Sequence, residues 1–395
     1  MDKQQEPRLR FKGFTGAWEE KVLGEILNVR NEFVDSSLYD LDVELENLIS
    51  NSGILVGDTS VRTQTTSLFR KGDILFGRLR PYLNKWWFAE KDGVKSGEIW
   101  ALETSSEYSN FFAYLLVQSR KFLETANITS GTKMPRADWR SLTAITFNFP
   151  SKPEQTHLGL FFRRLDSQIA ESRAVLEKSR QLKKAMLAKM FPANGEKIPQ
   201  IRFKGFEGEW ECRKLGIEVE IIGGGTPDTT NSAYWNGDID WYSPTEIGEA
   251  AYANGSVKKI TLLGLQKSSA QILPANRTVL FTSRASIGDM AILTKDGSTN
   301  QGFQSFVVGE RLDVYFFYTM GFKIKDYALK NASGSTFLEI SKNTLSQMEF
   351  FAPSLKEQTQ IGNFFRQLDE TIALQSAEVE KLNQLKKGLL AAMLV

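Results

Sequence analysis

The sequence contains very little of the two residues on which many catalytic and metal sites depend. It has one cysteine, Cys212, and one histidine, His157, among 395 residues. A single cysteine excludes an internal disulfide framework and a zinc site built from several cysteines, and it favours a reducing compartment. Any Ser-His-Asp or Cys-His catalysis would depend on His157 alone. We therefore expect neither a catalytic residue nor a metal site in this chain.

Long apolar runs and a dominant charge are absent too. The first thirty residues lack the ~7–15-residue apolar core of a secretory signal, and no stretch reaches the ~18 apolar residues that a membrane span needs. The 49 basic residues are balanced by 47 acidic ones, so no global positive field draws the chain to nucleic acid. We expect a cytoplasmic protein without membrane partners, in which any DNA binding depends on local patches.

Two segments of the chain occur twice. Residues 7–24, PRLRFKGFTGAWEEKVLG, recur at 199–216 as PQIRFKGFEGEWECRKLG. Residues 154–190, EQTHLGLFFRRLDSQIAESRAVLEKSRQLKKAMLAKM, recur at 357–393 as EQTQIGNFFRQLDETIALQSAEVEKLNQLKKGLLAAM. The chain therefore consists of two tandem halves.

The second repeated segment predicts a long amphipathic helix in each half. Its apolar residues are spaced mostly by alternating threes and fours, a pattern typical of helices that pair along a seam. About 37 residues at ~1.5 Å each make a rod of roughly 55 Å. Phe161 and Phe364 cannot share the seam with their neighbours, so they either pack beneath the globular segments or help to dock a partner. The expected seam residues are Phe162, Leu165, Ile169, Leu176, Phe365, Leu368, Ile372 and Val379.

The segments between the repeats are alike in kind but not in sequence. Both are rich in Gly, Thr, Ser and aromatic residues, with short alternating runs bounded by turns, which indicates strands. We expect an α/β (α+β) fold in which two long antiparallel coiled-coil helices separate two strand-rich domains, with an internal pseudo-two-fold duplication. The expected boundaries are 1–152 for the first domain, 153–192 for the first helix, 193–198 for a linker, 199–352 for the second domain and 353–395 for the second helix.

This ordered duplication resembles the specificity subunit of type I restriction-modification enzymes, over nearly the whole chain. The resemblance implies that each globular segment is a target-recognition domain reading one half of a split, asymmetric DNA target, with the helices as a ruler. It rests on the following segments: RFKGFTGAWEEKVLGE and RFKGFEGEWECRKLG, which open the halves; EQTHLGLFFRRLDSQIA and its copy, which open the helices; and KGDILFGRLRPYLNKWWFAEKDGVKSGEI, GGGTPDTTNSAYWNGDIDWYSPTEIG and LPANRTVLFTSRASIGDMAI in the domains.

The same resemblance implies that the chemistry belongs to partner subunits. The expected partners are double-stranded DNA, two methyltransferase subunits that use S-adenosylmethionine to methylate adenine, and a restriction subunit that translocates DNA with ATP and Mg²⁺. The sequence agrees, because it contains no G-x-x-x-x-G-K-[ST], H-E-x-x-H or Asn/Asp-Pro-Pro-aromatic motif. We expect a non-catalytic recognition subunit without cofactors of its own. The alternatives are a free-standing bipartite DNA-binding protein and an enzyme with an unfamiliar site.

Candidate DNA contacts lie in both domains. Cations beside aromatic residues suit phosphate and base-edge contacts, and Arg, Asn and Gln read guanine or adenine edges. The alternative is that the cations are ordinary solvated surface and that Thr and Asn serve turns. Sequence matching aligns Arg80 of the first domain with Arg284 of the second. The candidates are Arg78, Arg80, Tyr82, Lys85, Lys133 and Arg136 in the first domain, and Thr226, Thr229, Thr230, Asn231, Arg284, Ser286, Asn300 and Gln301 in the second.

Overall fold

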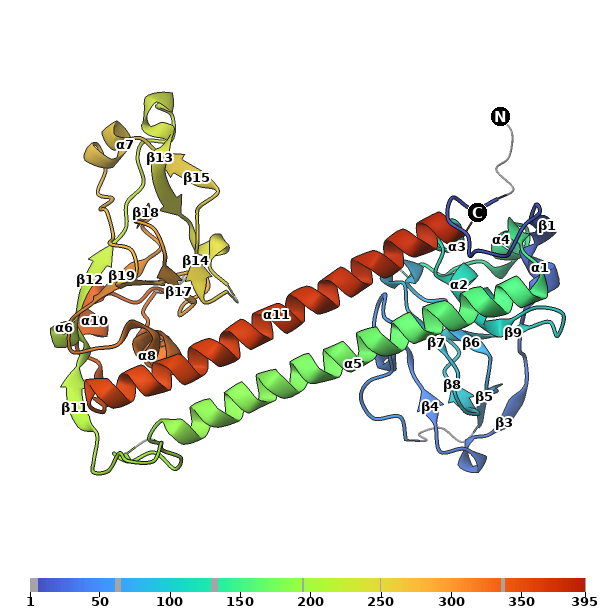
Figure 1. Ribbon diagram of the computed structural model, residues 1–395, viewed down its shortest axis with the longest axis horizontal. Coiled ribbons are helices and arrows are strands. Elements are labelled where there is room, and N and C mark those ends of the chain that lie inside the picture. Colours follow the sequence, from blue (N-terminus) through green and yellow to red (C-terminus); the bar gives the residue numbers. More distant parts are fainter. Residues whose placement is uncertain are drawn as a thin grey trace. The chain divides into compact units, whose positions relative to one another are not determined.

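The computed structural model describes residues 6–60, 65–128, 134–193, 195–248, 250–334 and 338–394. They form a mixed α/β structure with two compact units (Figure 1). Unit 1 comprises Met1–Ser172 with Glu378–Val395, and unit 2 comprises Arg173–Ala377. Each long helix therefore belongs partly to each unit, whereas the sequence suggested helices that follow the domains as separate segments. No helix in the described part of the chain is both long and apolar enough to cross a membrane.

The repeated segments form two helices of equal length. Helix α5 (Lys152–Met190) and helix α11 (Leu355–Met393) each contain 39 residues, and they are the long green and red helices of Figure 1. In unit 1 the end of α11 lies against the start of α5, and in unit 2 the end of α5 lies against the start of α11. The helices therefore run antiparallel. Of the expected seam residues, Phe162, Leu165, Ile169, Leu176 and Phe365 are buried, while Leu368, Ile372 and Val379 are half-buried.

Unit 1 contains two four-stranded sheets and one two-stranded pair. The sheets have the strand orders β2-β9-β6-β7 and β3-β5-β8-β4, and β1 pairs with β10. The strands are β1 (Glu19–Val22), β2 (Leu27–Val29), β3 (Phe33–Asp35), β4 (Asp42–Val43), β5 (Thr65–Phe69), β6 (Ile74–Gly77), β7 (Trp86–Phe88), β8 (Gly93–Lys95), β9 (Ile99–Thr104) and β10 (Thr146–Phe149). The short helices are α1 (Leu23–Ile26), α2 (Asn110–Val117), α3 (Arg120–Ala126), α4 (Trp139–Thr143), η1 (Ser36–Leu38), η2 (Leu45–Asn47) and η3 (Pro81–Leu83).

Unit 2 repeats this plan with a larger sheet. The sheets have the strand orders β12-β19-β16-β17-β14 and β15-β13-β18, and β11 pairs with β20. The strands are β11 (Glu211–Lys214), β12 (Val219–Gly223), β13 (Trp235–Tyr242), β14 (Tyr252–Ala253), β15 (Lys258–Ile260), β16 (Thr278–Phe281), β17 (Met290–Leu293), β18 (Gly297–Thr299), β19 (Gln304–Val308) and β20 (Glu349–Ala352). The short helices are α6 (Leu215–Glu218), α7 (Leu262–Gln266), α8 (Val314–Thr319), α9 (Gly321–Asn331), α10 (Lys342–Ser346), η4 (Ser232–Tyr234) and η5 (Pro244–Glu246).

A buried ion pair ties the start of each long helix to the first repeated segment. Arg10 contacts Glu154 at 2.7 Å, and Arg202 contacts Glu357 at 2.7 Å. Each arginine donates to its glutamate through two nitrogens, and these hydrogen bonds raise the pKa of both arginines above the ordinary value. The glutamates are only 2% and 1% exposed. The residues that build this joint are thus the same in both halves.

The neighbouring glutamine makes a second repeated joint. Gln155 Oε1 accepts a hydrogen bond from the amide of Ser109 at 3.1 Å, and Gln358 Oε1 accepts one from the amide of Asp313 at 3.0 Å. Both glutamines are buried. The Glu-Gln pair that opens each repeat therefore anchors the helix to the domain that precedes it.

Phe161 and Phe364 pack on the repeated segments rather than in the seam. The ring of Phe161 lies 5.2 Å from that of Phe11, and the ring of Phe364 lies 6.0 Å from that of Phe203, measured between centroids. Both contacts are edge-to-face, the arrangement that aromatic pairs favour. Of the two roles considered for these residues, packing against the globular part is the one that the contacts support.

Candidate nucleic-acid interface

In unit 1, three candidate DNA-binding residues lie on two segments that are joined through the backbone. Leu79 forms an isolated antiparallel bridge with Arg136. The amide of Ala137 donates to the carbonyl of Arg78 at 2.8 Å. The turn that follows β6 is thereby held beside residues 136 and 137. The structure thus brings Arg78, Arg80 and Arg136 together, although they are far apart in sequence.

These arginines differ in how firmly their side chains are held. Arg136 donates to both carboxylate oxygens of Glu98, at 2.7 and 3.1 Å, which raises the pKa of Arg136 and lowers that of Glu98. Arg78 is half-buried, and its Nε has no hydrogen-bond partner among the residues that the structure describes. Arg80 is exposed, and among the described residues its side chain has no hydrogen bond or ion pair. Arg80 is therefore the side chain of this cluster that is free to reach a ligand.

A buried lysine adds positive charge beside Arg78. Lys95, the last residue of β8, is only 4% exposed. Burial and the nearby charge of Arg78 lower the pKa of Lys95 to about 8. With Arg80 and Arg136, the cluster combines four cations with the carboxylate of Glu98. Such a local excess of positive charge suits the phosphate backbone of DNA.

The other candidates of unit 1 fall into different environments. Tyr82 is 57% exposed. Lys85 is half-buried, and its Nζ donates to the carbonyl of Leu45 at 2.7 Å. This lysine joins two segments of the domain, so its ammonium group is engaged within the fold rather than offered to a ligand. Lys133 lies outside the described residues.

In unit 2, the glycine-rich loop after β12 packs against the loop after β18. The hydroxyl of Thr226 donates to Oε1 of Gln301. A Cβ atom on Gly224 would overlap the carbonyl oxygen of Asn300, so a glycine is required for this close approach. The structure therefore brings Thr226, Asn300 and Gln301 together from two loops.

Arg284 joins this group through Gly302. The amide of Gly302 donates to Oδ1 of Asn300 at 2.8 Å. A Cβ atom built on Gly302 would lie 3.4 Å from Nε of Arg284. Arg284 is half-buried, and no hydrogen bond or ion pair of its side chain is found within the described residues. An arginine, an asparagine and a glutamine thus share one edge of the domain, as base-edge contacts require.

The remaining candidates of unit 2 serve turns or stay exposed. Both the amide and the hydroxyl of Thr230 donate to Asp228, at 2.9 and 2.8 Å. Asn231 caps η4 by accepting from the amide of Ala233 at 3.1 Å. These two contacts agree with the alternative that such residues shape the backbone. Thr229 and Ser286 are exposed.

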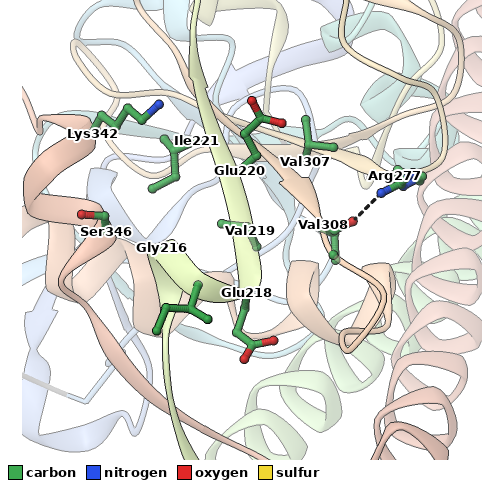
Figure 2. A pocket seen from close by; sticks show the side chains of 12 residues that line it. Gly216, Glu218, Val219, Glu220, Ile221, Arg277, Val307, Val308, Lys342 and Ser346 are labelled. Atoms are coloured by element: carbon green, nitrogen blue, oxygen red, sulfur yellow. Dashed lines mark hydrogen bonds between the residues drawn. The ribbon is translucent and has the colours of Figure 1, made fainter.

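A surface hollow of about 460 Å³ lies beside β12, away from these candidates. Its lining includes Glu220, Arg277 and Lys342 but none of the candidate DNA-binding residues. Figure 2 shows Arg277 at its rim, where this side chain donates to the carbonyl of Val308 at 3.5 Å. Because its lining carries acidic and basic groups together, the hollow offers no consistent charge for DNA. The described residues also contain no group of three or more His, Cys, Asp and Glu side chains suited to a metal ion.

Lys95 and Glu98 belong to the cluster of unit 1 but were not among the sequence candidates. Both lie in KDGVKSGEI, part of a segment that carries the family resemblance. Lys95 ends a strand of one sheet and Glu98 precedes β9 of the other, so only the fold places them beside the turn after β6. The sequence signal for these two residues is a lysine and a glutamate three positions apart, on either side of a Ser-Gly turn.

Several known proteins are similar to this chain in sequence. Residues 207–384 match the family described as type I restriction modification DNA specificity domain. The type I restriction enzyme MjaIX specificity subunit of Methanocaldococcus jannaschii is 33% identical over 181 residues, which are 45% of this chain and 42% of that protein. The match thus spans less than half of that relative. The type I restriction enzyme HindI specificity subunit of Haemophilus influenzae is 20% identical over 85% of this chain and 90% of its own length.

Two solved structures share the fold along nearly the whole chain. The S subunit of a type I restriction-modification system from M. genitalium has a TM-score of 0.65 at 15% identity and covers 99% of both chains. A chain from a study of complex assembly and conformational transition in the type I restriction-modification system has a TM-score of 0.54 at 18% identity, over 96% of this chain and 98% of its own. At these identities the comparison establishes the fold.

Proposed function

We propose that this chain is a type I restriction-modification specificity subunit and that it reads a bipartite and asymmetric DNA target. The sequence matches support the family expected from the sequence, and the solved structures share its fold. The chain is a non-catalytic recognition subunit of a type I restriction-modification complex.

The contrast between repeated joints and divergent surfaces carries the proposal. The joint of Arg10 with Glu154 recurs as that of Arg202 with Glu357. The candidate DNA-binding clusters do not recur, because unit 1 presents mainly cations, whereas unit 2 groups Arg284 with neutral amides and hydroxyls. Two domains of one fold with different surfaces suit two different half-sites, so the target should not be a palindrome.

The repeated segments support binding of two identical partners. The repeated segments present nearly the same residues twice, and a partner that recognises one copy can recognise the other. We propose that these partners are two methyltransferase subunits, which bind S-adenosylmethionine and methylate adenine. A restriction subunit that uses ATP and Mg²⁺ would complete the complex. The balanced charge of the chain fits this arrangement, since partners can supply part of the grip on DNA.

Deleting the gene in its host tests this function. Genome-wide adenine methylation, measured by long-read sequencing, should lose one split motif, with two short specific blocks around a run of unspecified bases. Restoring the gene should restore that motif. An unchanged methylation pattern would contradict the proposal. If the purified chain alone bound a split target tightly while methylation stayed unchanged, a free-standing bipartite DNA-binding protein would be the better description.

A further inference from the structure

The backbone around the candidate DNA-binding residues is the same in both domains. In unit 1 the amide of Arg78 donates to the carbonyl of Glu98 at 2.9 Å. In unit 2 the amide of Ser283 donates to the carbonyl of Gly302 at 2.8 Å. One residue earlier, Gly77 pairs with Ile99 in unit 1 and Thr282 bridges Phe303 in unit 2. The turn after β6 and the turn after β16 therefore begin at equivalent positions of the strand pairing.

The second strand beside each turn also corresponds. Leu79 bridges Arg136 in unit 1, and Arg284 bridges Glu339 in unit 2. The amide of residue 137 donates to the carbonyl of residue 78, and the amide of residue 340 donates to the carbonyl of residue 283, at 2.8 and 3.0 Å. We call this arrangement the recognition frame; it comprises residues 78–80, 98 and 136 in unit 1 and residues 283–285, 302 and 339 in unit 2.

The frame contains the same unusual backbone conformation in both domains. Arg80 has a φ of 50° and Ala285 a φ of 62°, although neither is glycine. A left-handed conformation is uncommon for residues with a side chain, so its occurrence at equivalent positions indicates a common constraint. It also corrects the sequence alignment: Arg80 corresponds to Ala285, and Arg284 corresponds to Leu79.

The side chains on this common backbone differ in charge and size at every position. By contrast, the ion pairs that anchor the long helices have the same residue types in both halves, Arg10 with Glu154 and Arg202 with Glu357. Preserved geometry with altered chemistry is what two domains need to present different groups to different ligands. The pairs in the frame are Arg78 and Ser283, Leu79 and Arg284, Arg80 and Ala285, Glu98 and Gly302, and Arg136 and Glu339.

Each frame holds one arginine that is available to a ligand. Arg136 is paired with Glu98, and Nε of Arg78 is buried, which leaves Arg80 as the exposed arginine of this frame. In unit 2, Glu339 replaces the paired arginine, and Gly302 leaves room beside Nε of Arg284. Neither Arg80 nor Arg284 has a side-chain partner in the described part of the chain. Arginine is the side chain best suited to the two acceptors of a guanine edge.

We propose that the recognition frame is the base-reading element of both domains, with Arg80 reading a guanine of one block and Arg284 reading a guanine of the other. This inference rests on the proposed function and assigns the specificity-determining residues within it. The two arginines stand one residue apart on the common backbone, because Arg80 occupies the left-handed position and Arg284 the position before it. The two domains therefore present their arginines from different points of the same turn.

The test is the methylation motif of a host that carries Arg80→Ala or Arg284→Ala in the full chain. Arg80→Ala should relax the preference for guanine at one position of one block, and Arg284→Ala should do the same in the other block only. The expected loss of discrimination is about 5- to 150-fold, the range for one base contact. Moving the arginine with Arg284→Ala/Ala285→Arg should change the base preferred at that position.

Arg70→Ala and Arg277→Ala are the matched controls. Arg70 precedes β6 and Arg277 precedes β16, so both are arginines at the opposite ends of the strands that lead into the frames. Both controls should leave the motif unchanged. Relaxed specificity in these variants would overturn the inference, because it would show that any surface cation has the same effect.

The remaining outcomes also decide the question. An unchanged motif in both frame variants would overturn the inference while leaving the function intact, whereas a gene deletion that changes no methylation would overturn the function itself. If a variant lost all methylation, its purified complex would be tested on duplexes with single base substitutions. Loss of one base preference would support the inference. Uniform weakening on every duplex would overturn it, because that pattern marks a phosphate contact.

Discussion

Lys386 Nζ lies 2.7 Å from Asp166 Oδ1, so an ion pair joins the end of α11 to the first half of α5. Lys386 also donates to Gln118 Oε1 at 2.7 Å. The same pair recurs in unit 2, where Lys183 contacts Asp369 at 2.5 Å. A charge pair between antiparallel helices has only one register in which both groups are satisfied. The duplicated pairs therefore align the helices at both ends.

Reversing one charge of this pair should destabilise unit 1. Lys386→Glu would place two carboxylates together in a partly buried site, with an expected cost of about 1–3 kcal/mol. A drop of several degrees in melting temperature is expected, since about 1 kcal/mol corresponds to ~2–4 °C in a unit of this size. The double variant Asp166→Lys/Lys386→Glu restores opposite charges and should recover most of the loss. Equal melting of single and double variants would show that the pair has no such role.

Breaking the joint at the start of α11 should cost more. Glu357→Ala leaves Arg202 without its buried partner, and removing one member of such a pair typically costs about 3–5 kcal/mol. The melting temperature of unit 2, or its resistance to proteolysis, reports this loss. Glu209→Ala is the control, because its pair with Lys197 is exposed and should contribute less than about 1 kcal/mol. Similar effects of the two substitutions would contradict the buried joint.

The sequence predicts those features that depend on local periodicity or on repetition. The spacing of threes and fours predicted the buried seam positions Phe162 and Phe365, because a helix face follows directly from the residues per turn. Repetition predicted two domains of one fold. Comparison of the two copies could also have paired Glu154 with Arg10, since both residues recur in the second half, although no local pattern links them.

The recognition frame could not be predicted because it is assembled by tertiary contacts. Glu98 reaches Arg136 only through the bridge between Leu79 and residue 136. Matching identical letters aligned Arg80 with Arg284 and missed the true register by one residue. A shift of one residue is decisive here, because it changes which side chain stands at the left-handed position. Lys85 was likewise a reasonable candidate by type, but its ammonium group is used within the fold.

The stability of unit 1 should depend on pH through Lys95. Burial and Arg78 lower the pKa of Lys95 to about 8, whereas the unfolded chain keeps this lysine protonated up to its ordinary value of 10.5. Between about pH 8 and 10.5 the unfolded state binds more protons, so the free energy of unfolding should rise with pH, by at most about 3 kcal/mol. Lys95→Met should remove this rise. Identical pH dependence of melting in both proteins would contradict it.

Adding one methyl group to the frame of unit 2 should disturb one block of the target. A Cβ on Gly302 would lie 2.7 Å from Cγ of Pro244 and 3.0 Å from Oδ1 of Asn300, so Gly302→Ala forces the frame to shift. Such overpacking costs about 1–3 kcal/mol. We expect weaker methylation with reduced specificity in one block only. Gly97→Ala is the control in unit 1, because its Cβ would meet no atom within 4 Å. Equal effects of both variants would count against this account.

The central claim is that each domain reads its own block of the DNA target. The two domains share a fold through the internal duplication, but neither determines the block that the other reads. This claim is tested most directly by a chain in which residues 217–352 are replaced by a second copy of residues 25–152, with folding checked by melting. Two identical domains on antiparallel helices should meet opposite strands of the duplex. The account predicts that the methylated motif becomes symmetric, one block followed by its own reverse complement. A motif that still contains the second, unrelated block would contradict it.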